Sequence, residues 1–88
     1  MTIGKRHDLT PGDEVLEPGE YGRLYTDNEW YCRAPQSGDF YAGMGRLSSH
    51  EVIEHEDGTI TVSPSILITG HHDKQWHGYL ERGMWREV

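Results

Sequence analysis

Glycine and proline interrupt this chain so often that a long helix has little room to form. The 88 residues include eleven glycines and four prolines, and both residue types break helices. No eleven-residue window repeats apolar side chains at the i, i+3, i+4, i+7 spacing of an amphipathic helix. Short segments of alternating apolar and polar residues are present instead. The sequence therefore predicts an all-β or mostly β fold, as a small single antiparallel domain: a compact sandwich or a partly open barrel of hairpins.

The clearest hairpin is predicted at residues 50–63. Asp57-Gly58 suits a two-residue type I′ turn, because both central positions of that turn need a positive φ. Such a turn sets Ile53 opposite Val62, and the alternation of apolar residues gives the same register. The side chains expected on the buried face are Ile53, His55, Ile60 and Val62.

A second hairpin is predicted from residues 75–80 and 84–88. The intervening Glu81-Arg82-Gly83 fits a three-residue loop whose last residue is a glycine in the αL conformation. This register pairs Tyr79 with Trp85 as an aromatic cross-strand contact. Large side chains then lie on both faces of the hairpin, so we expect one face either to be covered or to bind a partner.

Shorter strands are expected to complete the domain, over Tyr21–Thr26 and Trp30–Arg33. The proline within Ser63-Pro64-Ser65 lacks an amide donor and should interrupt the hydrogen-bond ladder. The apolar run Ile66–Thr69 that follows predicts a fully buried strand. Gly78 is expected where neighbouring strands approach so closely that a Cβ would intrude.

Charge limits the partners that the protein can have. Acidic residues outnumber basic ones by 15 to 8, which gives a formal net charge of −7. That balance disfavours direct binding to nucleic acid or to anionic membranes. The chain has no apolar run near 18 residues, and its start lacks the apolar core of a signal peptide. We therefore expect a cytoplasmic monomer or small homo-oligomer.

The acidic residues concentrate toward the N-terminus. Between Asp8 and Glu29 there are seven carboxylates and one basic residue, Arg23. Residues 1–20 are expected to form an acidic arm that is ordered only if it docks, and residues 21–88 to form the β-domain. The arm would either solubilise the protein or occupy a basic groove on another protein, imitating nucleic-acid phosphates. The residues expected to make the interaction are Asp13, Glu14, Glu17, Glu20, Tyr79 and Trp85.

Histidines and the single cysteine form the other candidate site. Zinc usually takes four nitrogen or sulfur ligands, often in close pairs such as C-x₂-C, and this chain has no such pair. The sequence therefore predicts no cofactor, with zinc as the alternative, and no catalytic residues. Cys32 also excludes an intramolecular disulfide and is expected to fill space in the core. The weak metal-ligand candidates are Cys32, His71, His72 and His77.

Two motifs in the second half of the chain carry a resemblance. Residues 57–66 read D-G-T-I-T-V-S-P-S-I, and residues 76–85 read W-H-G-Y-L-E-R-G-M-W. Their order and spacing resemble those of small, functionally uncharacterised bacteriophage proteins, including proteins of actinobacterial phages. Members of that family also carry an upstream C-P-x-C pair that suggests a metal knuckle, whereas this chain has only Cys32, with Ser37-Gly38 where a second ligand would be sought.

The resemblance implies a phage gene product that works inside a bacterial cell. Together with the charge and the aromatic residues, it leads us to expect a non-enzymatic accessory protein that binds a host or phage protein. The alternatives are a small zinc-binding or hydrolytic domain that uses the histidine-rich loop, an acidic nucleic-acid mimic, and a minor virion component.

Overall fold

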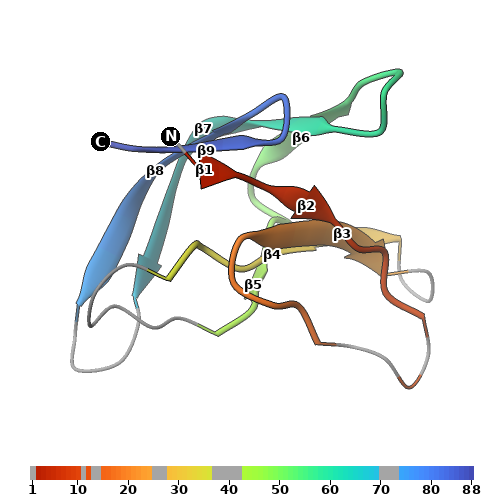
Figure 1. The fold of residues 1–88 in the computed structure, drawn as a ribbon, viewed down its shortest axis with the longest axis horizontal. Coiled ribbons are helices and arrows are strands. Elements are labelled where there is room, and N and C mark those ends of the chain that lie inside the picture. The colour runs from red at the N-terminus through yellow and green to blue at the C-terminus, as the bar shows by residue number, and fades with distance from the viewer. Residues whose placement is uncertain (1, 11, 13–14, 25–27, 37–42, 70–73) are drawn as a thin grey trace.

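The computed structural model describes residues 2–10, 12, 15–24, 28–36, 43–69 and 74–88. Their strands form two sheets, a larger one in the order β1-β9-β8-β7-β6 and a smaller one in the order β2-β3-β4-β5. Figure 1 shows one sheet above the other. The all-β expectation is confirmed, with a sandwich of open sheets and no closed barrel. The strands are β1 (Thr2–Ile3), β2 (Lys5–Arg6), β3 (Glu20–Leu24), β4 (Glu29–Cys32), β5 (Gly45–Arg46), β6 (Glu51–Glu54), β7 (Ile60–Thr69), β8 (Gln75–Glu81) and β9 (Met84–Glu87).

The main core lies between the two sheets. Alternate residues of β8 are buried in this layer, and apolar side chains from β3, β4, β7 and β9 join them, so their burial drives the sheets together. The indole rings of Trp76 and Trp85 meet edge to face, with centroids 5.3 Å apart. The Trp85 Nε1–H donates a hydrogen bond of 2.8 Å to the carbonyl oxygen of Gly19, so the buried ring has a polar partner. The buried core residues are Tyr21, Cys32, Ala34, Leu47, Ile60, Val62, Ile66, Trp76, Leu80 and Trp85.

The described part of residues 1–20 is docked onto the rest of the domain, which is the condition under which the acidic arm was expected to be ordered. Strand β1 pairs with β9, and β2 then pairs in parallel with β3 in the other sheet. The chain changes sheets at Gly4, whose N–H donates to the carbonyl oxygen of Gly83 at 2.7 Å. Leu9 and Leu16 are fully buried and pack with Leu24 in a second cluster. These apolar side chains and the paired backbone hold the segment, although acidic residues dominate its composition.

The first hairpin forms where it was predicted, but its register differs by one residue. Strands β6 and β7 pair Val52 with Val62 and Ile53 with Thr61. The loop has three residues, because the N–H of His55 donates to the carbonyl oxygen of Thr59 at 2.8 Å. Gly58 takes the αL position with φ of 87°. The one-residue shift places Ile53 on the face that points away from the core, and its side chain is 47 % exposed.

The loop of the second hairpin is one residue shorter than predicted, whereas the loop of the first is one residue longer. Strands β8 and β9 pair Glu81 with Met84 and Leu80 with Trp85, so the loop has two residues. Arg82 and Gly83 have φ of 47° and 77°, as a type I′ turn requires. The predicted Tyr79–Trp85 pair is therefore wrong. Trp85 lies beside Leu80 on the core face, whereas Tyr79 is opposite Arg86 on the other face.

Strand β7 is irregular where Pro64 was expected to interrupt it. Its register with β8 shifts between Val62 and Ile66, and the Ser63–Pro64 peptide is cis. Beyond this point Ile66 is buried and Leu67 is 59 % exposed, so the prediction of a fully buried strand was wrong. The close approach at Gly78 is confirmed, because a Cβ there would lie 2.3 Å from the carbonyl oxygen of Arg86.

Candidate functional site

The structure separates the metal-ligand candidates that it describes. Cys32 on β4 is buried between the sheets, and burial raises the pKa of its thiol to about 12, which disfavours the thiolate that a metal needs. His77 is exposed on β8, on the face that points away from this core. No group of three or more histidine, cysteine or acidic side chains is placed to hold a metal ion among the described residues. His71 and His72 lie outside those residues.

The side chain of His77 contacts the hydroxyl of Ser65 on the neighbouring strand β7. Its Nε2 lies 2.9 Å from Ser65 Oγ, and Nε2 of His50 lies 3.1 Å from the carbonyl oxygen of the same serine. A nucleophilic serine also needs an acidic group that orients the histidine. Among the described residues, Ser65 is the hydrogen-bond partner of the His77 side chain, and no acidic residue is bonded to that ring. The geometry therefore fits two histidines that hold the irregular part of β7 in place.

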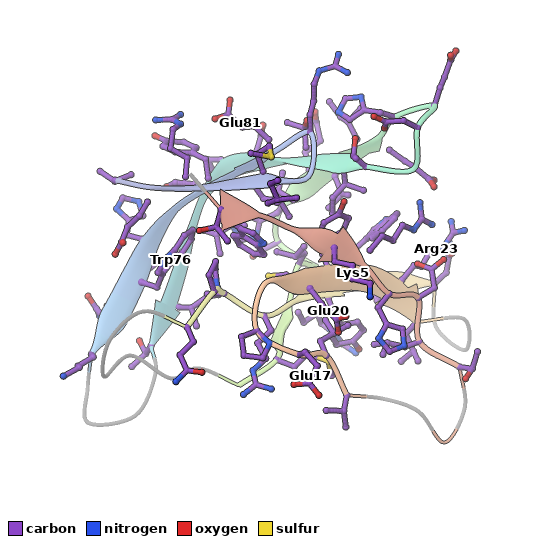
Figure 2. All side chains as sticks on the ribbon, in the orientation of Figure 1. Lys5, Glu17, Glu20, Arg23, Trp76 and Glu81 are labelled. Carbon is purple, nitrogen blue, oxygen red and sulfur yellow. The ribbon has the colours of Figure 1, made fainter. Side chains whose placement is uncertain are left out.

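The predicted acidic interaction residues do not form one exposed set. Glu17 is exposed, but Glu20 is 9 % exposed, and its Oε1 accepts a hydrogen bond of 2.8 Å from the Glu17 backbone N–H. The same oxygen lies 3.3 Å from Nδ1 of His7. Figure 2 shows the side chains of both glutamates on the lower side of the smaller sheet. Asp13 and Glu14 fall in a part of the chain that is not described.

Asp8 is another acidic residue that is engaged within the fold. Arg6 Nε lies 3.0 Å from Asp8 Oδ1, and the backbone N–H of Arg23 donates to the same oxygen at 3.1 Å. Partial burial disfavours the charged carboxylate of Asp8, but these hydrogen bonds outweigh it and lower the pKa. Arg6 also binds Glu54 Oε2 at 2.5 Å, and so links the smaller sheet to the first hairpin of the larger one.

Arginine side chains lie over three partly buried aromatic rings. The guanidinium of Arg86 lies 4.5 Å from the centroid of Tyr79 and also binds Glu81 at 2.8 Å. Trp30 has two such neighbours, Arg6 at 5.2 Å and Arg23 at 5.6 Å. The third ring is Tyr31, which lies 5.7 Å from Arg46. Of the two aromatic interaction residues predicted, Tyr79 is thus a half-buried ring under an arginine, and Trp85 is a core residue only 1 % exposed. Trp85 is therefore unsuited to the surface role expected of it.

Apolar side chains gather instead on the outer face of the larger sheet, the face turned away from the smaller sheet. The register places Val88, His77 and Leu67 in one row across three chain segments, and the Val88 N–H donates to the carbonyl oxygen of His77 at 2.9 Å. A second row runs from Ile3 through Met84 toward the first hairpin. Figure 2 shows Glu81 on this side and Trp76 on the other. The apolar and aromatic members of this outer face are Ile3, Ile53, Leu67, Tyr79, Met84 and Val88.

Two members of the outer face were assigned by sequence to the core. Ile53 was misplaced by the one-residue register error, and Leu67 by reading an apolar run as a buried strand. The sequence holds no signal for this, because Ile66, Leu67 and Ile68 are all apolar, and only the structure places Leu67 on the face opposite its two neighbours. Ile3 and Val88 are 79 % and 72 % exposed. The pairing of β1 with β9 brings Ile3 to this face, and the hydrogen bond to His77 on β8 places Val88 there.

Comparisons with known proteins assign no family to the chain. No protein-family model, curated protein or solved structure matches it. None of the described segments forms a helix of the length and apolarity needed to cross a membrane.

Proposed function

We propose that the protein is a non-catalytic protein-interaction module that binds its partner on the outer face of the larger sheet. The observation that carries the proposal is the exposure of large apolar side chains there: Ile3 is 79 % exposed, Leu67 59 % and Ile53 47 %. Apolar side chains gathered on one exposed face are typical of interaction surfaces. The partner is a host or phage protein, and the resemblance to phage proteins supports this setting.

Polar groups on the same face support a specific rather than a purely adhesive contact. The ion pair of Arg86 with Glu81 lies beside Tyr79, whose ring the guanidinium covers. Aromatic and arginine side chains are the usual centres of binding energy in protein interfaces. A partner with a matching apolar patch would cover Leu67 and Val88 while it hydrogen-bonds to this polar cluster. The net charge of −7 further favours a basic partner, because opposite charges speed encounter.

Two matched aspartate substitutions test this proposal. Leu67→Asp places a carboxylate on the outer face, whereas Val15→Asp places one at a residue that is 65 % exposed but outside the larger sheet. We expect the tagged protein and the Val15→Asp variant to retain the same partner from the cells in which the protein is naturally made. The Leu67→Asp variant should retain at least ten-fold less, with unchanged circular dichroism.

Equal retention by Leu67→Asp and the unmodified protein would contradict the proposal. Loss with both variants would also contradict it, because binding would then depend on the overall charge and not on this face.

A further inference from the structure

Gly45 occupies a strand position for which the fold requires no glycine. It pairs with Cys32, so a side chain at residue 45 would lie on the inner face of the smaller sheet. Its φ is outside the range that favours glycine. A Cβ built there meets one atom within 4 Å, the carbonyl oxygen of Cys32 at 3.8 Å. By contrast, a Cβ at Gly78 would collide with backbone atoms at 2.3 and 2.9 Å.

The space that a side chain at residue 45 would occupy is part of a cavity. This cavity has a volume of about 360 Å³ and is bordered by β4, β5, the segment that follows β5 and the second half of β7. Protein sites for small ligands start at about 300 Å³. A cavity of about 150 Å³ already binds benzene in another protein. The side chains that line the cavity include Cys32, Met44, Leu47, His50, Ile66 and Ile68.

The lining determines the class of ligand. Among the described residues that line it, most side chains are apolar and none is acidic, although the chain has a net charge of −7. Arg46 also borders the cavity, but its guanidinium hydrogen-bonds to the Tyr31 hydroxyl at 3.1 Å. Tyr31 and Arg46 pair next to Cys32 and Gly45, so their side chains lie on the opposite face of the smaller sheet. The other polar side chains of the described lining are His50 and Thr69. Both ring nitrogens of His50 already have partners, because Nε2 lies 3.1 Å from the carbonyl oxygen of Ser65 and Nδ1 lies 3.5 Å from Ser49 Oγ. A charged group would thus lack an ionic partner among the described lining residues, which favours a neutral ligand.

We infer that this cavity is a binding site for a neutral, mostly apolar ring compound of about the size of indole, kept open by Gly45. A glycine within a strand lowers stability relative to alanine, and it often marks a place where a ligand approaches closely. The chain carries this cost at a place where neither backbone conformation nor packing requires a glycine. The cavity shares one lining residue, Leu67, with the proposed partner surface, whereas Gly45 and Cys32 face the inside of the sandwich.

Titration of the full-length protein with indole, followed by NMR, tests the inference. We expect saturable shifts at millimolar or lower indole, confined to the amides of Cys32, Leu47, Ile66 and their neighbours. Gly45→Leu fills the cavity, so it should weaken indole binding at least ten-fold while the melting temperature stays equal or rises. Ser48→Leu is the matched control: it adds the same side chain three residues later, at an exposed position outside the lining, and should bind as the unmodified protein does.

Three results would overturn the inference. The first is the absence of saturable shifts with indole, and the second is equal binding by the Gly45→Leu variant. The third is tighter binding of indole-3-carboxylate than of indole, because the ligand class would then be anionic. If Gly45→Leu fails to fold, Gly45→Ala replaces it and should weaken binding by a smaller factor.

Discussion

Gly78 shows how a single residue sets the distance between strands in this protein. A Cβ at this position would lie 2.3 Å from the carbonyl oxygen of Arg86 and 2.9 Å from Cα of Glu87, and both are backbone atoms that cannot rotate away. We expect Gly78→Val to lower the free energy of unfolding by about 1–3 kcal/mol, because strands β8 and β9 must separate. Urea denaturation measures this change. Gly45→Ala is the control and should not lower stability, so equal losses in the two variants would contradict the packing argument.

A second prediction at the scale of single residues concerns Asp8 and the dependence of stability on pH. Its folded-state pKa is lower than the ordinary value of 3.8, because the hydrogen bonds from Arg6 and Arg23 outweigh the effect of partial burial. A lowered pKa adds stability above the unfolded pKa, and this contribution is lost as the pH falls through the folded value. We therefore expect Asp8→Asn to be less stable than the unmodified protein at pH 6, with a difference that shrinks below about pH 4. Urea midpoints measured from pH 6 to 2 provide the test, and a constant difference would contradict it.

At the scale of elements, the sequence predicts where the hairpins lie but not their exact register. Both loops contain a glycine with positive φ, at Gly58 and Gly83, and both glycines mark the correct turns. The loop lengths were assigned the wrong way round. For the second loop the reason is that Arg82 adopts a positive φ, which arginine rarely takes. Tertiary contacts hold it there: the Arg82 N–H donates to Thr61 Oγ1 at 3.1 Å, and the Gly83 N–H donates to the carbonyl oxygen of Ile60 at 3.0 Å. Such contacts with another hairpin are invisible to a local reading of the sequence.

The corrected second turn makes a prediction that the original register would not make. Asparagine tolerates the left-handed conformation better than arginine does, and it is the preferred first residue of a type I′ turn before glycine. Arg82→Asn should therefore raise the free energy of unfolding by about 0.5–1 kcal/mol in urea denaturation. The side chain of Arg82 is exposed, so its removal should cost little. A destabilised Arg82→Asn variant would argue against the two-residue turn.

At the scale of the whole molecule, composition was a poor guide to the N-terminal segment and to the candidate site. Acidic residues around Glu17 suggested a flexible arm, whereas the fully buried Leu9 and Leu16 hold the segment against the smaller sheet. The candidate interaction face combines Ile3 and Leu67 from distant parts of the chain, so it depends on strand order, which no local pattern reports. Of the predicted interaction residues that the structure describes, Tyr79 lies on that face, whereas Glu17, Glu20 and Trp85 do not.

The docked N-terminal segment can be tested with two neighbouring residues. Leu16 is fully buried, whereas Val15 beside it is 65 % exposed. We expect Leu16→Ala to lower the free energy of unfolding by about 2–5 kcal/mol, as for other large-to-small core substitutions. Val15→Ala should change it by no more than about 0.5 kcal/mol.

Hydrogen exchange adds an independent measurement, because the amides of His7 and Leu9 donate to the carbonyl oxygens of Tyr21 and Arg23 at 2.8 and 3.0 Å. Both amides should exchange slowly in the unmodified protein and faster in Leu16→Ala. If Leu16→Ala were as stable as Val15→Ala and both amides exchanged freely, the segment would be a detachable arm, and the smaller sheet would have to keep its strands together without it.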